Sequence, residues 1–325
     1  MSEANYNGLN EVGISFVVVN FNMSGLVYRL VERIQRHVVG QFRYEIIMGD
    51  NSTDQGFRLD DRFDDEADAV LVRFPTNEGF VKAAAALLSR AKYKYVVMLH
   101  PDVDFKENCI SQLIGYMEEH PKAGIVSPNL LYPDGSPCSI RLSFATPTTE
   151  CKRVLNLMAR GLIKRNVMRD EHLWDRQSDV EVDMVMSVCM VIRNEVLLQI
   201  GPINSRLWTY YFNDWLGLKI RQVGYTCHYL RDAVAIHYER FADPSLYSRE
   251  ADSAYKMTPI PVEGGMQKDR FIFLRDAHSG LMVFVFKIIT SIEYFYMIIS
   301  CLPRYRKRRQ DIIAYRKALK TIFCA

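Results

Sequence analysis

The 325-residue sequence lacks several patterns that would place it in a common class of protein. Its seven cysteines include no Cys-x-x-Cys pair and no regular spacing, which argues against a zinc site and against a disulfide framework. Residues 1–10 are polar and contain no apolar core of a signal peptide. A net charge of +3 is too small to suggest a nucleic-acid partner. These absences predict a reduced, cytoplasmic protein that does not bind nucleic acid.

Glycine-rich loops, internal repeats and low-complexity linkers are also missing from the chain. No Gly-x-Gly-x-x-Gly follows the first apolar segment, which argues against a dehydrogenase, and the glycine-rich basic loop of a sugar nucleotidyltransferase is absent. The composition, with 49% hydrophobic and 24% charged residues, is that of a folded protein. The length allows one large domain with an extension, or two modest domains.

Strand-like and helix-like segments alternate along the chain. Strands are predicted at residues 14–19, 44–48, 69–74, 95–105, 123–128, 183–192 and 233–236, and helices at 24–37, 80–91, 195–200, 215–223 and 281–302. This alternation is typical of βαβ units, so we expect an α/β fold with a mostly parallel sheet flanked by helices. We expect the sheet domain to span residues 12–240 and a helical C-terminal extension to span 241–325. Residues 151–179 match no pattern that we can interpret.

The segment Tyr95-Val-Val-Met-Leu-His-Pro-Asp-Val-Asp-Phe105 combines an apolar strand with an acidic end. A strand buried on both faces suits valine, tyrosine and leucine, whereas Asp102 and Asp104 do not suit burial. In open α/β sheets, ligands bind beyond the carboxyl ends of such strands, and carboxylates there suit a divalent cation that carries phosphates. The alternative is a plain turn, since His-Pro-Asp is turn-like and aspartate is common after strands.

Eight short motifs follow one another between residues 13 and 240. They are Val18-Val-Asn-Phe-Asn22, Gly49-Asp-Asn-Ser-Thr-Asp54, Asn77-Glu-Gly-Phe80, His100-Pro-Asp-Val103, Tyr132-Pro-Asp-Gly135, Val182-Asp183 with Cys189 to Arg193, Tyr211-Phe-Asn-Asp214, and His237. In this order and spacing they resemble the inverting glycosyltransferases of family 2, which have the GT-A fold, and most closely the rhamnosyltransferase-like branch. Each motif is weak alone, and the ordered set is specific.

The resemblance implies that polar residues after the first three strands bind a nucleotide. Asn20 and Asn22 carry amides that can contact a base or ribose, and Asp50 can accept a hydrogen bond from a pyrimidine N–H or a ribose hydroxyl. Asn77 and Gly79 allow a polar contact and a close backbone approach to the nucleotide. For Asp50 the alternative is an Asx-turn that only closes the loop.

Asp102 resembles the second acid of the family's Asp-x-Asp element, which contacts the metal. His100 stands where the first acid is expected, and we assign it to the donor side because an imidazole can ligate Mn²⁺ or hydrogen-bond a ribose. His237 matches a histidine that reaches the metal and diphosphate in relatives, although a histidine after a strand is often structural. Asp104 is a weaker candidate, because strand alternation points it away from Asp102. The resemblance therefore implies a Mn²⁺ or Mg²⁺ cofactor.

Asp214 is the expected catalytic base. Inverting transfer needs one carboxylate that deprotonates the acceptor hydroxyl while its oxygen attacks the anomeric carbon. The family supplies this base from a Glu-Asp pair at a helix start, and this chain has Asn213 followed by Asp214. The alternative is that Asp214 caps the helix and meets its dipole.

Aromatic residues surround this base in the sequence. Trp208, Tyr211 and Trp215 offer flat faces on which a sugar ring can stack, and Asp183 is a further, weaker candidate for acceptor binding. The alternative is that at least two of the aromatic side chains belong to a buried core cluster.

Residues 281–302 form an apolar segment that would nearly span a bilayer, but Lys287 and Glu293 interrupt it and make a spanning helix unattractive. On a helical wheel one face is entirely apolar: Phe284, Ile288, Ile292, Phe295, Ile299 and Leu302. A basic run over residues 304–309 follows. We therefore expect peripheral membrane contact through residues 281–309. The alternative is a helix packed on the catalytic domain or on a second subunit.

The expected function is that of an inverting, metal-dependent glycosyltransferase at the cytoplasmic face of a membrane. By resemblance, the donor is a nucleoside-diphosphate sugar, with dTDP-L-rhamnose first and a UDP-sugar second. The acceptor is a hydroxyl of a glycan or lipid-linked glycan in polysaccharide assembly, and the sequence allows a homodimer. The alternative is a non-catalytic relative that binds glycans or scaffolds an assembly, because His100, Asn213 and Leu216 replace acids of the family.

Overall fold

A computed structural model describes residues 12–38, 41–52, 68–162, 174–238 and 259–324 of the chain. It divides into two compact units, each built from several stretches of sequence. The first unit comprises residues 1–142, 174–205 and 216–255, and the second comprises 143–173, 206–215 and 256–325. The domain junction expected at residue 240 falls within 239–258, outside the described residues.

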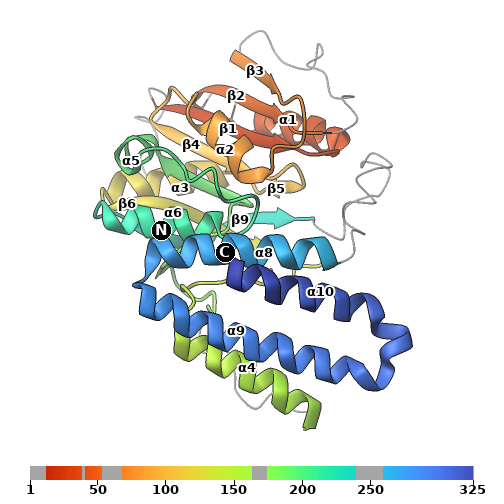
Figure 1. Cartoon of the computed structure of the whole chain (residues 1–325). Coiled ribbons are helices and arrows are strands. Elements are labelled where there is room, and N and C mark those ends of the chain that lie inside the picture. The colour runs from red at the N-terminus through yellow and green to blue at the C-terminus, as the bar shows by residue number, and fades with distance from the viewer. Residues whose placement is uncertain (1–11, 39–40, 53–67, 163–173, 239–258, 325) are drawn as a thin grey trace. The chain divides into compact units, whose positions relative to one another are not determined.

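Four parallel strands begin the first unit, in the order β3-β2-β1-β4. They are β1 (Gly13–Asn20), β2 (Arg43–Asp50), β3 (Asp68–Arg73) and β4 (Tyr95–Leu99), with α1 (Ser24–Val38) and α2 (Phe80–Leu88) between them in sequence. All eight residues of β1 are buried, as expected for a central strand of a parallel sheet covered on both faces. Figure 1 shows these strands side by side in the red to yellow part of the chain. The predicted βαβ half of the fold is confirmed.

The remaining strands make the sheet mixed rather than mostly parallel. Within the described residues nine strands pair, and the order continues from β4 to β8, β6, β9 and β5, while β7 pairs with β9. Their bounds are β5 (Val103–Phe105), β6 (Ala123–Leu131), β7 (Val180–Val182), β8 (Cys189–Arg193) and β9 (Thr226–His237). β8 runs antiparallel to both β4 and β6, and β5 runs antiparallel to β9.

The predicted strand 95–105 is two strands in the structure. β4 ends at Leu99, a turn follows at Pro101 and Asp102, and β5 then pairs with a different neighbour. Proline has no N–H to donate to a ladder, so the strand cannot continue through it as a central strand. The predicted strand 183–192 is similarly replaced by β7 and β8, with a loop between them.

Helices complete the first unit, and one of them approaches the backbone closely. They are α3 (Cys109–Glu119), α5 (Asn194–Ile200) and the part of α6 (Phe212–Gln222) from residue 216 onward. A Cβ on Gly217 of α6 would lie 2.3 Å from the carbonyl oxygen of Asp183 and 2.9 Å from the Cβ of Met184. Only glycine fits this contact without displacing backbone atoms.

The described residues from 259 onward are helical, as expected for the C-terminal extension, and they belong to the second unit. It contains α4 (Pro147–Leu162), α8 (Pro259–Ala277), α9 (Gly280–Cys301) and α10 (Tyr305–Cys324). Figure 1 shows α4 lying along α9, and α10 lying against α8 and α9. The predicted helix over 281–302 is confirmed as α9, whereas α4 was not predicted.

Two helical glycines give a matched test of the packing around α6. Gly217→Ala should lower the free energy of unfolding by about 1–3 kcal/mol, because the added methyl group overlaps the backbone at Asp183. Gly115→Ala in α3 meets nothing within 4 Å and should raise it by about 0.4–1 kcal/mol through reduced entropy of the unfolded chain. Chemical denaturation of both variants checks this. Equal effects of the two substitutions would contradict the close approach.

Candidate functional site

Three side chains in the first unit form a group that can hold a metal ion. The ligand atoms of His100, Asp102 and His237 all lie within 4.8 Å of one another. The Nε2 atom of His237 is 3.4 Å from the Oδ2 atom of Asp102, whose residue is only 3% exposed. Two imidazoles and one carboxylate form a donor set that fits a divalent transition metal.

Strand pairing brings these three residues together. His100 follows β4, where its N–H donates to the carbonyl oxygen of Val188 at 2.9 Å. Val103, the first residue of β5, pairs with His237 at the end of β9, and the N–H of Tyr238 donates to the carbonyl oxygen of Asp102 at 2.9 Å. The turn that ends β4 and the antiparallel β5–β9 ladder therefore fix the group.

In this group, Asp102 and His237 form a buried charged pair, and His100 is neutral. Desolvation opposes the charge on His237, but hydrogen bonds to Asp102 and Cys138 outweigh it and raise the pKa of His237 to about 9. Desolvation also opposes ionisation of Asp102, yet the hydrogen bond from His237 and the nearby His100 hold the pKa of Asp102 below its usual value. Burial lowers the pKa of His100 to about 4, so its imidazole is neutral and able to ligate at pH 7.

Asp104 lies outside this group. It belongs to β5, and its Oδ1 is 3.0 Å from the Nε of Arg33 on α1, whose guanidinium also lies over the ring of Tyr238. Successive residues of a strand point to opposite faces, which separates Asp104 from Asp102. The structure thus gives Asp104 an ion pair with Arg33 instead of a place among the candidate ligands.

Asn20 and Asp50 lie side by side at the carboxyl ends of β1 and β2. The Nδ2 of Asn20 donates to the Oδ1 of Asp50 and to the Oγ of Ser52, both at 3.1 Å. The Oδ1 of Asn20 accepts from the N–H of Met23 at 3.0 Å. Asn20 is fully buried, and these contacts tie the end of β1 to the loop after β2, while its nucleotide contact stays a prediction.

Asp50 forms the Asx-turn that the sequence left open as an alternative. Its Oδ1 accepts from the N–H of Ser52 at 3.2 Å, and its Oδ2 lies 3.1 Å from the NH1 of Arg73. Ser52 also accepts from the N–H of Asn22, a buried residue with a positive φ of 56°. The sequence analysis quoted Ser52 inside its motif without singling it out, and it missed Arg73 because that residue ends the next strand.

Amide side chains join the loop after β2 to the loop before α2. The Oδ1 of Asn77 accepts from the Nδ2 of Asn51 and from the N–H of Gly79, both at 2.9 Å. In return, the Oδ1 of Asn51 accepts from the N–H of Glu78 at 2.8 Å. Gly79 precedes α2 with a φ of 78°, a backbone conformation that favours glycine. Asn51 was another position that the sequence analysis did not single out.

In the second unit, a buried carboxylate holds the loop that precedes Asp214. Asp269 of α8 is fully buried, and its carboxylate accepts from the backbone N–H groups of Trp208, Thr209 and Tyr210 at 2.9–3.1 Å. Three successive N–H donors on one anion form a rigid turn. Asp214 follows in the first turn of α6 and is 1% exposed. Asp269 had no signal in the sequence, because its partners lie about sixty residues away.

The aromatic residues near Asp214 divide into an exposed and a buried set. Trp208 is 50% exposed. Tyr211, with a φ of 59°, stacks on Phe273 with ring centroids 5.6 Å apart. Trp215 is 3% exposed, and its Nε1 donates to Asp276 at 3.2 Å. The indole of Trp215 is therefore part of the core in this conformation, and sugar stacking on it stays a prediction.

Asp183 is occupied by an ion pair within the first unit. Its Oδ1 pairs with the NH1 of Arg221 on α6, and its N–H donates to the carbonyl oxygen of Leu142 at 2.9 Å. These contacts fix the loop against α6, beside the close approach at Gly217. Acceptor binding by Asp183 stays a prediction.

The sequence is similar to glycosyltransferases. An N-acetylglucosaminyl-diphospho-decaprenol L-rhamnosyltransferase of Mycobacterium tuberculosis is 22% identical over 228 residues, which are 68% of this chain and 69% of that protein. Among solved structures, S. aureus TarS superposes with a TM-score of 0.54 at 12% identity, over 95% of this chain. This chain spans only 55% of TarS, about half of its length.

A shorter form of the same protein, TarS 1–349 in complex with UDP, superposes with a TM-score of 0.51 at 12% identity, over 95% of this chain and 90% of that one. These likenesses confirm the predicted GT-A fold. The sequence model described as "Glycosyl transferase family 2" matches residues 15–201, more than half of the chain. The protein therefore belongs to glycosyl transferase family 2.

Proposed function

We propose that the protein is an inverting, metal-dependent glycosyltransferase that moves a sugar from a nucleoside diphosphate to a hydroxyl of a glycan or lipid-linked glycan. The observation that carries this proposal is the group formed by His100, Asp102 and His237 beyond the carboxyl end of β4. The strand order reverses at β1, because β2 lies on one side of β1 and β4 lies on the other, and the group is next to this point. Ligands of open α/β sheets bind at such switch points.

The donor is proposed to be dTDP-L-rhamnose, with a UDP-sugar as the second choice. The rhamnosyltransferase likeness over two thirds of the chain supports rhamnose, and the TarS structure with UDP supports the second choice. The acceptor named for the Mycobacterium tuberculosis protein is a sugar diphospho-lipid, which supports a lipid-linked glycan and a site at the cytoplasmic face of a membrane. Donor selectivity rests on a few contacts in the pocket and not on the fold.

The side chains present fit a divalent cation, with Asp102, His237 and His100 as its ligands. When bound, such a cation neutralises charge that develops on a leaving diphosphate. Two nitrogen ligands suit Mn²⁺ better than Mg²⁺, which prefers oxygen. The imidazole of His100 keeps a ligand at the position where the family has its first acid, so this replacement does not by itself favour the non-catalytic alternative.

Asp214 is proposed to be the base, and its chemistry is a single displacement. Its carboxylate takes the proton of the acceptor hydroxyl as that oxygen bonds to the anomeric carbon and the bond to the diphosphate breaks. The configuration inverts because attack and departure occur on opposite faces. Asp269 holds the preceding loop, and the exposed ring of Trp208 offers a face on which the acceptor sugar can stack.

The proposal is tested first by measuring release of nucleoside diphosphate from dTDP-rhamnose and a panel of UDP-sugars, with Mn²⁺, Mg²⁺ or a chelator. We expect slow release from one donor that the chelator abolishes. Donor binding is measured on the same samples, so that a need for the acceptor is recognised. A protein that binds no donor and releases no diphosphate would favour the non-catalytic scaffold.

The metal site gives a separate prediction that does not depend on turnover. Asp102→Ala should weaken binding of Mn²⁺ by more than about 100-fold, because changes to outer-shell partners of a metal ligand alone cost 10–100-fold. The matched control is Asp104→Ala, which removes a carboxylate two residues away that pairs with Arg33 and should bind Mn²⁺ normally. Titration calorimetry measures both affinities. Normal binding by the Asp102 variant would refute the assignment.

The base assignment predicts the effect of one substitution in α6. Asp214→Asn should lower kcat about 10²–10⁴-fold while leaving donor binding and Mn²⁺ binding intact, since general base catalysis supplies a factor of this size. The exposed Asp232, which pairs with Arg231, serves as the control in Asp232→Asn and should retain full activity. Steady-state transfer rates of both variants with a hydroxyl acceptor test this prediction. Activity of the Asp214 variant within tenfold of the parent would exclude it as the base.

Asp269 is predicted to be a positioning residue for the loop before the base. Asp269→Asn replaces one carboxylate oxygen, which accepts hydrogen bonds, with an NH₂ group that faces backbone N–H donors. The loop should then shift, so sugar transfer to the acceptor substrate should fall at least tenfold, with a raised KM for that substrate. Donor hydrolysis without acceptor and Mn²⁺ affinity should not change. The control Asp311→Asn breaks only an ion pair with Arg308 on α10. A uniform loss of donor binding and stability would point to misfolding instead.

A further inference from the structure

The solvent-facing side of helix α9 is apolar, although two polar residues of the same helix are buried. Thr290 is fully buried, and the buried Glu293 forms an ion pair with Arg153 of α4. Among residues 281–302, every exposed side chain except that of Ser300 is apolar. A surface helix of a soluble protein normally turns its apolar residues toward the core and its polar residues toward water.

Six of the exposed residues form one continuous apolar stripe along α9. They follow one another at intervals of three or four residues, which places them on one side of the helix. The apolar stripe consists of Phe284, Ile288, Ile292, Phe295, Ile299 and Leu302. The helix has 22 residues and is therefore about 33 Å long. A contiguous exposed apolar surface of this kind marks contact with another protein or with a membrane.

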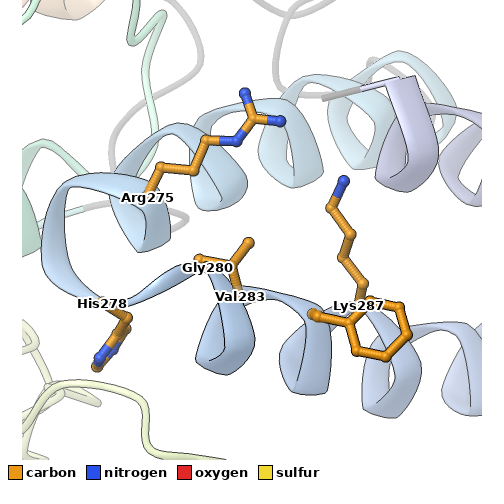
Figure 2. Close-up of a pocket in the computed structure, with 6 residues that line it drawn as sticks. Arg275, His278, Gly280, Val283 and Lys287 are labelled. Carbon is orange, nitrogen blue, oxygen red and sulfur yellow. The ribbon is translucent and has the colours of Figure 1, made fainter.

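The apolar stripe begins beside a cavity of about 340 Å³ at the corner between α8 and α9. Phe284 lines this cavity and is also 57% exposed. Figure 2 shows Val283 and Lys287 of α9 beside the cavity, with Arg275 at the end of α8. At this end the apolar stripe is therefore recessed and not flat.

A group of cations follows the apolar stripe directly in the sequence. Arg306, Lys307 and Arg309 are exposed in the first turns of α10, and they fall within about two helical turns of Leu302. In the part of the chain that the structure describes, none of the three pairs with a carboxylate, whereas their neighbour Arg308 is paired with Asp311. The end of the apolar stripe is therefore marked by three exposed positive charges.

The contacts of α9 argue against a helix that crosses the membrane, although its length and composition would allow one. Glu293 is held by Arg153 of α4, and Arg153 also pairs with Glu150 of α4. Since α4 packs along α9, a spanning α9 would draw these charged residues into the hydrocarbon core, where they are costly. A helix that lies in the membrane plane keeps them on the side of the protein.

The basic residues decide between a second copy of the chain and a membrane as the partner of the apolar stripe. Helix α10 carries seven basic residues and one acidic residue. A symmetric dimer through the stripe would bring two copies of this charge together, which is unfavourable. An anionic bilayer attracts the same residues and supplies acyl chains for the stripe. The cations need not converge on one point, because the charge of the leaflet is spread over many head groups.

We propose that the apolar stripe of α9 docks in the plane of an anionic membrane, with its side chains at the boundary of the acyl chains and with Arg306, Lys307 and Arg309 at the level of the head groups. An amphipathic helix inserts its apolar face to this depth while its opposite face stays on the protein. The inference uses residues of the second unit alone and does not rest on the proposed transfer reaction.

Co-flotation of the full chain with vesicles tests the surface. The parent should bind vesicles that contain phosphatidylglycerol more tightly than vesicles of phosphatidylcholine. R306Q/K307Q/R309Q should lose about a hundredfold in affinity for the anionic vesicles, from a factor of about five for each basic residue near the leaflet. The matched control R43Q/K106Q/K122Q removes three exposed cations of the first unit and should bind as the parent does. F284S/F295S should lose at least about tenfold on both kinds of vesicle, because it removes inserted apolar area.

A depth measurement tests the orientation of α9. F284W and F295W place an indole at two positions of the apolar stripe that are about 16 Å apart along the helix. The emission of the three native tryptophans is subtracted with the parent protein. Quenching by lipids that carry a nitroxide at a known depth should give the same shallow depth for both positions. Depths that differ by about 16 Å would show a spanning helix and overturn the proposal.

Three results of the binding assay would also overturn it. If R306Q/K307Q/R309Q binds anionic vesicles as the parent does, the cations of α10 do not face the membrane. If the first-unit control loses as much affinity, the attraction is a diffuse effect of net charge. If F284S/F295S turns a dimer in solution into a monomer and binds vesicles as the parent does, the stripe contacts a second copy. Circular dichroism and thermal unfolding confirm that each variant is folded.

Discussion

The buried carboxylate of Asp102 sets the constraint on which the candidate site depends. A charge that is 3% exposed is stable only with a close partner, and in this structure the partner is His237 at 3.4 Å. That pairing requires β5 to lie beside β9, and it requires β4 to end at the turn through Pro101. The same geometry leaves His100 desolvated and neutral. The ligand atoms of His100, Asp102 and His237 already lie close together, and they would hold a divalent cation if one is bound.

Two buried carboxylates, Asp269 and Glu293, also organise the second unit, and their partners are of different kinds. Asp269 is satisfied by three backbone N–H groups, so it fixes the conformation of a loop instead of balancing a side-chain charge. Glu293 is satisfied by Arg153, which allows α9 to turn its polar side toward α4. In both cases hydrogen bonds offset the free-energy cost of burying an anion. They also restrict the positions that the groups around the anion can take.

The sequence predicts those parts of the fold that periodicity encodes. The β1 to β4 segments and α9 were found because apolar residues recur at strand or helix spacing, and each of the six residues assigned to the apolar face of α9 is exposed. The split of residues 95–105 was missed because the pairing of Val103 with His237 is a contact between distant segments. The roles of Asp104, Trp215 and Asp269 were not predictable for the same reason, since each depends on a partner from another element.

Helix α8 holds the segment around Asp214 at two points. Asp269 contacts the loop before Asp214, and Asp276 contacts Trp215, the residue after it. Residues 269 and 276 fall within two turns of α8, so one helix contacts both the loop before Asp214 and the indole of Trp215. The fully buried Asp269 anchors this arrangement, because any displacement of the loop would break hydrogen bonds to a buried carboxylate.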